Sequence, residues 1–190
     1  MQRLFELELD QSVLPNSDFN AGDSAEFSRK LAAKGWIGMT WPKEYGGAGR
    51  SFLERYVVTE ELLAAGAPVG CHWIADRQSG PLLLKFGTEE LKNRFLPQIV
   101  AGNYFFSIGM SEPDTGSDLA SIRTSATKTE GGWLLNGSKI WTSYAHTNHF
   151  MVTLVRSEPA SENRHAGMSQ MIVDLNDEKV VVTGIKNLAG

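Results

Sequence analysis

The chain has 190 residues and a formal net charge of −4, with 42% hydrophobic and 21% charged residues. These proportions exclude an intrinsically disordered or fibrous protein and are typical of a globular one. The sequence has no basic stripe and no Lys/Arg clusters interleaved with aromatic residues, which argues against a nucleic-acid partner. A chain of this length suits one large domain or two small ones.

The N-terminal segment and the cysteine content indicate in which cellular compartment the protein is expected. The first residues are acidic and interrupted by charges, unlike a signal or transit peptide, and no run approaches the roughly 18 apolar residues that cross a bilayer. A single cysteine, Cys71, excludes an internal disulfide framework and a multi-cysteine zinc site. The four histidines lack metal-ligand spacing. We therefore expect a cytoplasmic protein with no membrane span and no metal, in which Cys71 is a small buried side chain.

Helical periodicity runs from about residue 23 to residue 101. Apolar spacing, N-cap residues and terminal glycines predict helices over residues 23–34, 51–65 and 72–86. The second of these helices has apolar positions at Phe52, Tyr56, Leu62 and Leu63. Thr88 can cap a fourth helix, in which Pro97 predicts a break or a kink. We interpret residues 1–103 as an all-α domain.

After residue 103 the pattern changes to short apolar or alternating runs that are typical of strands. These runs cover residues 104–110, 124–129, 133–135, 149–155, 168–175 and 179–185. Residues 130–132 form a turn before the third run, and Asn136-Gly137 after it is a strong hairpin signal because both residues tolerate positive φ. We interpret residues 104–190 as a β domain, a barrel, which makes the chain an α+β protein.

The loop at 109–118, Gly-Met-Ser-Glu-Pro-Asp-Thr-Gly-Ser-Asp, follows the first predicted strand. Glycine lets the backbone approach a ligand closely, and backbone amides with small hydroxyl side chains can bind an anion. A phosphate or a pyrophosphate would be the guest of such a loop. Loops of this composition are also ordinary turns, so the residues alone leave both interpretations open.

The segment at 139–144, Lys-Ile-Trp-Thr-Ser-Tyr, offers a second set of contacts. A tryptophan at a strand end can form one flat wall for a planar heteroaromatic cofactor, and the hydroxyl residues beside it can form hydrogen bonds. The alternative is a core tryptophan beside exposed Thr and Ser. The two segments together make a binding site a stronger prediction than either segment does alone.

Ser-Glu-Pro-x-x-Gly-Ser-Asp at 111–118, followed by Asn-Gly-x-Lys-x-Trp-x-Ser at 136–143, resembles the signature of the acyl-CoA dehydrogenase family. Segments 35–36, 41–47 and 86–97, with Gly102, are similar to that family's helical domain. The resemblance extends over nearly all of the chain. It implies an N-terminal helical domain and a middle β-barrel domain, and we expect the chain to stop before the C-terminal helical bundle of the family.

The resemblance also implies that the chain binds FAD. Ile108, Met110 and Ser111 would lie against the isoalloxazine ring, with the Ser111 hydroxyl on its polar edge. Gly116 and Ser117 would contact the FAD pyrophosphate, and Ser117 would also contact the CoA part of an acyl-CoA substrate.

The tryptophan segment would complete this half of the flavin site. Trp141 would pack against the flavin as a wall, and Thr142 and Ser143 would contribute hydrogen bonds near N5 and O4. The sequence departs from the family at Asp114, where many members have Gly or Asn, and at 144–145, where Tyr-Ala replaces a common Asn-Gly. Neither departure is expected to abolish flavin binding.

The activity implied by the resemblance is FAD-dependent α,β-dehydrogenation of an acyl-CoA thioester to a trans-2-enoyl-CoA, with electrons passed to an electron-transfer flavoprotein. The family's glutamate base is expected beyond Gly190, because Glu112 and Asp118 suit structural roles as turn or cap acceptors. The 190-residue piece is therefore not expected to turn over by itself. The full-length protein would be a homo-oligomer, a tetramer or a dimer.

Two alternatives remain open. The first is an acyl-CoA oxidase or a flavin monooxygenase of the same fold, and the second is a catalytically silent fragment or partner subunit. Short-chain, branched, long-chain and steroid side-chain thioesters are all possible substrates. The polar run at 72–78 is explained by a helix that exposes Asp76 and Arg77 to water, or by recognition of a bulky or oxygenated acyl group.

Overall fold

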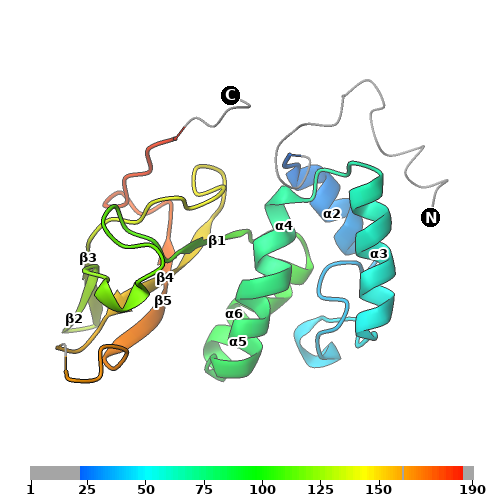
Figure 1. The fold of residues 1–190 in the computed structure, drawn as a ribbon. Coiled ribbons are helices and arrows are strands. Elements are labelled where there is room, and N and C mark those ends of the chain that lie inside the picture. Colours follow the sequence, from blue (N-terminus) through cyan, green and yellow to red (C-terminus); the bar gives the residue numbers. More distant parts are fainter. Residues whose placement is uncertain (1–21, 160, 186–190) are drawn as a thin grey trace. The chain divides into compact units, whose positions relative to one another are not determined.

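A computed structural model of the chain describes residues 22–159 and 161–185. The chain divides into two compact units, one up to Phe105 and one from Phe106 to Ile185. We call them the helical unit and the sheet unit, because the first contains the described α-helices and the second contains the described strands (Figure 1). A helical region followed by a β-sheet region confirms the predicted fold class at this level.

The predicted helices are present, with the limits α2 Ala25–Ala33, α3 Phe52–Ala64, α4 Gly70–Ile74, α5 Gly80–Phe86 and α6 Glu89–Val100. A short 3-10 helix, η2, covers Lys43–Tyr45, and a π-helical turn, η3, covers Ala75–Ser79 and joins α4 to α5 without interruption. Side chains cap the free amides at three N-termini, from Ser24, Ser51 and Thr88. These caps explain why the sequence located the starts of α2, α3 and α6 well.

Trp41 is the largest of the fully buried side chains, with 2% of its surface exposed. A Cβ added to Gly80 would collide with the indole, and one added to Gly47 would collide with the Trp41 backbone. A Cβ on Gly38 would lie 3.2 Å from the indole. The absence of side chains at Gly38 and Gly80 makes space for the indole, and that at Gly47 allows a close approach to the Trp41 backbone.

The apolar positions expected on α3 are only partly correct. Leu62 is buried together with Val58, but Phe52, Tyr56 and Leu63 are exposed. The helix carries two apolar stripes, and helical periodicity alone does not reveal which stripe faces the core. Only the stripe of Val58 and Leu62 does so within this unit.

The break expected at Pro97 does not occur, because α6 continues to Val100. Proline removes one backbone hydrogen bond and clashes with the preceding turn, which costs about 3 kcal/mol in a helix interior. Phe95, Leu96 and Ile99 are almost completely buried on either side of it. The burial of these three side chains offsets that cost, and the helix continues past the proline.

The expectation that Asp76 and Arg77 face water is wrong for Asp76, which is buried. The amide of Gly38 donates a 2.7 Å hydrogen bond to its carboxylate. Arg77 is half-buried, donates from Nη2 to Thr59 Oγ1 at 2.7 Å and lies 4.3 Å above the Trp73 ring. The π-helical turn that contains both residues changes the register of the helix, which helical periodicity in the sequence does not reveal.

His72 is buried and forms a hydrogen bond with Ser28 at 2.8 Å between Nδ1 and Oγ. The Ser28 hydroxyl donates its proton to the Ser24 carbonyl, so it must accept from His72, whose Nδ1 therefore carries the proton. Burial, together with the nearby Arg77, lowers the pKa of His72 to about 3. The folded chain thus keeps this imidazole neutral over most of the acidic range.

A pH dependence follows from His72. Between its unfolded pKa of about 6.5 and its folded pKa of about 3, the unfolded chain binds a proton that the folded chain does not. This group is expected to cost about 1.4 kcal/mol of stability for each unit of falling pH in that window. Urea unfolding at several pH values should show a shallower acid loss for His72→Gln. The exposed His146→Gln serves as the control, and equal slopes in both variants would contradict the prediction.

The sheet unit is a five-stranded mixed sheet built on β4. The strands are β1 Phe106–Gly109, β2 Ser125–Thr129, β3 Gly132–Asn136, β4 Phe150–Arg156 and β5 Met168–Asp174. β1 pairs with β4 in parallel, β5 pairs with β4 antiparallel along its whole length, and β2 meets the end of β4 through a single pair, Ser125 and Arg156. The pairings of the described strands do not form a closed ring, so closure into a barrel stays a prediction.

Two details of the predicted sheet need correction. The β2–β3 hairpin turns at Glu130-Gly131, as the first turn signal predicted, and not at Asn136-Gly137. Gly137 follows the end of β3, and a Cβ there would collide with Thr124, so this glycine serves a close approach of two backbones and not a hairpin turn. Local sequence cannot distinguish these two uses of glycine.

The strand expected at 179–185 is absent, and this segment has no regular structure. Its apolar side chains Val181, Val182 and Ile185 are exposed. A strand forms only where another strand accepts its backbone hydrogen bonds, and no strand of the described residues pairs with this segment. Its alternating composition alone was therefore an insufficient signal.

Within the described residues, no helix has the length and apolar character needed to cross a membrane. The same part of the chain contains no group of three or more His, Cys, Asp or Glu side chains placed to hold a metal ion. Cys71 is buried, as expected. Burial, with Asp23 nearby, raises the pKa of its thiol to about 11, so the sulfur is a poor nucleophile at neutral pH.

Candidate functional site

The two segments singled out in the sequence lie side by side in the sheet unit. Three hydrogen bonds join them: Ser107 Oγ to Ser143 O at 2.8 Å, Lys139 Nζ to Met110 O at 3.0 Å, and Ile140 N to Ser111 O at 2.9 Å. Two of these bonds, at Met110 and Ser111, lead to the consecutive residues Lys139 and Ile140. Ile108, Met110 and Ser111 are thus adjacent to the segment that carries Trp141, Thr142 and Ser143.

A buried ion pair anchors this arrangement. The ammonium of Lys139 lies 2.9 Å from the carboxylate of Glu112, and the two side chains are 6% and 7% exposed. The Glu112 carboxylate also accepts hydrogen bonds from the amides of Arg123 at 2.7 Å and Thr124 at 2.9 Å. Burial acts to raise the pKa of Glu112, but the hydrogen bonds from Thr124, Arg123 and Lys139 outweigh it and lower the pKa to about 2. Glu112 is therefore ionised, and both of its carboxylate oxygens accept hydrogen bonds.

Trp141 is 70% exposed and does not lie at a strand end, as its sequence context suggested, but in a loop. Its φ is 59°, and that of Tyr144 is 60°, both in the left-handed region. This conformation costs a residue with a Cβ about 1–2 kcal/mol, and such strain clusters at functional sites. The loop thus holds a flat aromatic surface outward on a strained backbone.

Thr142 and Ser143 differ in their surroundings. The Thr142 hydroxyl is buried and has no hydrogen-bond partner among the described residues. A hydroxyl buried in this way is costly and calls for a partner. Ser143 is exposed, and its carbonyl is fixed by Ser107 Oγ, which in turn accepts from Asn148 Nδ2 at 3.0 Å. The hydroxyl of Thr142 is a candidate hydrogen-bonding group for a ligand, and so is that of Ser143.

Gly116 and Ser117 lie exposed just after a tight turn, in which Glu112 and Thr115 exchange two backbone hydrogen bonds. No described atom lies within 4 Å of a Cβ placed on Gly116, so its surroundings are open. Asp118 accepts hydrogen bonds from Ser121 Oγ at 2.6 Å and from the Arg164 guanidinium at 2.7 Å. These bonds agree with the structural role expected of Asp118. Among the described residues, no hydrogen bond joins Gly116 or Ser117 to the tryptophan segment.

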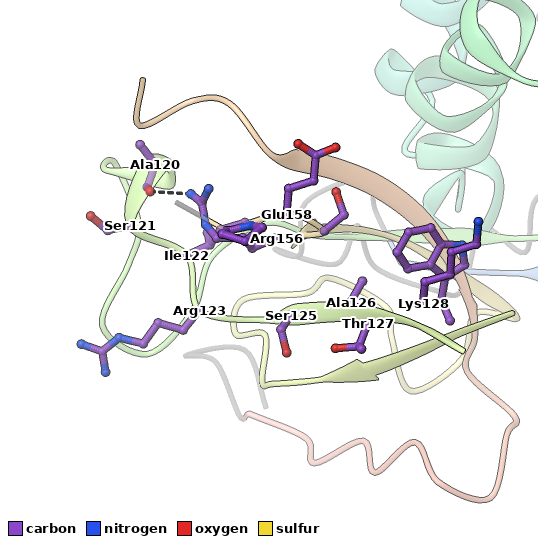
Figure 2. A pocket seen from close by; sticks show the side chains of 13 residues that line it. Ala120, Ser121, Ile122, Arg123, Ser125, Ala126, Thr127, Lys128, Arg156 and Glu158 are labelled. Atoms are coloured by element: carbon purple, nitrogen blue, oxygen red, sulfur yellow. Dashed lines mark hydrogen bonds between the residues drawn. The ribbon is translucent and has the colours of Figure 1, made fainter. Parts of the chain in front are cut away.

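Figure 2 shows a separate open groove of about 1010 Å³ in the same unit, lined by residues of 120–128, Trp133 and 156–159. None of the predicted flavin contacts lines it. Arg156, which lies along it, is occupied by the carbonyls of Ala120 and Ala166, both at 2.9 Å. This groove is therefore not the site that the sequence motifs describe.

Sequence reasoning did not assign a role to Lys139, Ser107 or Asn148. Lys139 stood in the motif, but nothing near it in sequence shows that its ammonium reaches Glu112, 27 residues away. Asn148 is buried and donates to the Phe106 carbonyl at 2.8 Å, so it fixes the start of β1. The sequence offered only a polar residue beside apolar neighbours at Lys139 and at Asn148. Without the fold, this pattern is a weak indication of a buried polar contact.

The chain matches two consecutive domain families. Residues 9–103 match the acyl-CoA dehydrogenase N-terminal domain, and residues 107–190 match the acyl-CoA dehydrogenase middle domain. The acyl-CoA dehydrogenase FadE26 of Mycobacterium tuberculosis is 39% identical over 163 residues, which cover 85% of this chain and 40% of that protein. The chain thus spans about two-fifths of this curated relative.

Solved structures agree with these matches. The Tcur3481-Tcur3483 steroid ACAD is 41% identical with a TM-score of 0.76, over 81% of this chain and 39% of that one. The ChsE4-ChsE5 complex from Mycobacterium tuberculosis is 39% identical with a TM-score of 0.74, over 80% and 39%. A FAD complex of PigA is 26% identical with a TM-score of 0.67, over 80% and 40%. The chain therefore belongs to the acyl-CoA dehydrogenase family, through that family's N-terminal and middle domains.

Proposed function

We propose that this chain forms the flavin-contacting half of an FAD-dependent acyl-CoA dehydrogenase. The observation that carries the proposal is the exposed Trp141 on a strained backbone, beside the partnerless buried hydroxyl of Thr142. An aromatic face and an unsatisfied donor, fixed next to Met110 and Ser111, suit a planar ring with a polar edge. The open surroundings of Gly116 leave room for the pyrophosphate that joins the two halves of FAD.

The residues of this chain would bind and orient the cofactor. Trp141 would cover one face of the isoalloxazine ring, and Ile108 and Met110 would supply apolar contacts. The hydroxyls of Thr142 and Ser143 would bond its polar edge. When bound, FAD supplies the hydride acceptor for the β-carbon of the thioester, and the electrons then pass to an electron-transfer flavoprotein.

We propose that the general base of the dehydrogenation lies outside the residues of this site. Dehydrogenation removes a weakly acidic α-proton, which needs a carboxylate free to accept it. Glu112 is held by an ammonium and two amides, and Asp118 is held by Ser121 and Arg164. Neither carboxylate is available, so a base from another segment or another chain is required for turnover.

A steroid-type acyl-CoA is the proposed substrate class, and a second dehydrogenase-like chain is the proposed partner. Two solved structures similar to this chain are the Tcur3481-Tcur3483 steroid ACAD and the ChsE4-ChsE5 complex, and the second of them joins two different proteins. A partner chain would supply the base that this site lacks. This reading combines two expectations from the sequence, dehydrogenase chemistry and a role as a partner subunit.

The test of flavin binding is the visible spectrum of the purified chain after addition of FAD and removal of free cofactor. We expect a retained flavin band. Trp141→Ala should weaken FAD binding about tenfold or more, because stacking of a ring on an aromatic side chain is worth about 1–3 kcal/mol. Trp133→Ala, which removes a half-exposed tryptophan outside the site, should leave binding unchanged. A folded chain that retains no flavin would contradict the proposal.

A further inference from the structure

We propose that Lys139 is a positioning residue for the flavin, because its buried ammonium sets the spacing between the two segments that would contact the ring. We call these segments the front segment, residues 107–111, and the tryptophan segment, residues 139–143. The inference rests on the proposed flavin binding and deepens it. Lys139 itself would not touch the cofactor, and it would act through the backbone of Met110.

The ammonium joins three parts of the sheet unit at one point. It donates to the Met110 carbonyl at 3.0 Å, at the end of β1, and to the Glu112 carboxylate at 2.9 Å. Glu112 in turn accepts from the amides of Arg123 and Thr124, directly before β2. The tryptophan segment, which carries Lys139, is thereby tied to both the front segment and the start of β2.

The lysine side chain has little freedom to take another path. A Cβ on Gly109 would lie 2.6 Å from Met151 Sδ and 3.2 Å from Lys139 Cγ, so the stem of the lysine packs closely against the backbone of β1. On the other side, Gly137 is pressed against Thr124. The backbone just before Lys139 is thus held close to Thr124, whose amide donates to Glu112.

The tryptophan segment depends on such a contact because it belongs to no strand. Besides the bond of Lys139, two hydrogen bonds join it to the front segment, from Ile140 N to Ser111 O at 2.9 Å and from Ser107 Oγ to Ser143 O at 2.8 Å. A strand in a ladder is positioned by many hydrogen bonds, whereas a loop is positioned by the few that it makes. A buried ion pair often adds little net stability, because the cost of desolvation offsets the attraction between the charges. We therefore assign the Lys139–Glu112 pair the role of fixing the geometry of the two segments.

The experiment compares the unaltered chain with Lys139→Met and with the matched control Lys128→Met, which removes an exposed lysine of β2. Hydrogen exchange of the Ile140 amide reports the spacing without any cofactor. FAD titration reports the affinity, and the shape of the bound flavin band with quenching of flavin fluorescence reports the ring environment. Lys139→Gln, which keeps a polar donor, provides a second variant if Lys139→Met does not fold.

We expect Lys139→Met to lower the exchange protection of Ile140 about tenfold or more, while amides in the β4–β5 ladder keep theirs. FAD affinity should fall about tenfold or more, because small misplacements of a binding group are costly, and the flavin band should shift. Lys128→Met should change none of these quantities. Lys139→Gln should be intermediate.

Unchanged protection at Ile140, or lost protection with unchanged flavin affinity and spectrum, would overturn the positioning role. Failure of the unaltered chain to bind FAD would overturn the proposed function instead. In that case, a selective loss of Ile140 protection in Lys139→Met would still support the role of Lys139 in setting the spacing of the two segments. The two failures therefore have different signatures.

Discussion

Replacing Trp41 with alanine is expected to lower the free energy of unfolding of the helical unit by about 3–5 kcal/mol. Removal of a buried aromatic ring costs its burial energy and leaves a cavity. The neighbours of the indole include Gly38 and Gly80, and glycines have no side chains that could move into the space. The loss should therefore be at the upper part of the usual range.

One effect opposes this loss. The indole Nε1 of Trp41 is buried and has no hydrogen-bond partner among the described residues, so its removal relieves a cost of about 1–3 kcal/mol. Trp41→Phe separates the two effects, because it removes the N–H group and fills most of the space. It should cost less than half as much as Trp41→Ala. Urea unfolding followed by circular dichroism measures both, with Trp133→Ala as the exposed control. Equal losses for alanine and phenylalanine would contradict the cavity argument.

Replacing Glu112 with alanine is expected to destabilise the sheet unit by about 3–5 kcal/mol, because it leaves a buried ammonium without its counter-charge. The amides of Arg123 and Thr124 also lose their acceptor. Asp114→Ala is the matched control, since it breaks an exposed ion pair with Arg123 in the same unit, and such pairs contribute about 0–1 kcal/mol. A double variant, Glu112→Ala with Lys139→Met, should cost less than the sum of the single variants.

The carboxylate of Glu112 is also expected to make the stability of the sheet unit fall at acidic pH. The pKa of Glu112 is lowered to about 2 in the folded chain, from an ordinary value of about 4.5. Its contribution to stability is complete above pH 4.5 and is lost as the pH falls from there towards 2, because only the unfolded chain then binds the proton readily. Glu112→Gln should flatten this part of the stability profile in urea unfolding. If the stability of Glu112→Gln falls as steeply with pH as that of the unaltered chain, other groups cause the loss and the prediction is wrong.

Much of this architecture could be predicted from local signals. Ser24, Ser51 and Thr88 cap their helices with side-chain oxygens, and this chemistry is readable from a few neighbouring residues. The alternation in β2 and the apolar run in β4 are also local. The order of helices and strands followed from these signals, together with the family resemblance.

The errors share a different cause, which is contact between residues far apart in the chain. Asp76 is buried because the amide of Gly38 meets it, and Gly137 is required because Thr124 lies against it. Neither partner is visible from the neighbouring sequence. The candidate site shows the same division. Its residues are predicted from the motifs, whereas the Lys139–Glu112 ion pair beside them is visible only in the fold.

The left-handed backbone at Trp141 bears on how this chain would change over generations. At that φ, glycine or asparagine would be tolerated with little strain, and either could arise through a few nucleotide changes. Under the proposed flavin contact of Trp141, a lineage that no longer binds FAD would be free to accept such a replacement and so relieve the strain. We then expect related chains that keep an aromatic residue at this position to be those that bind the flavin.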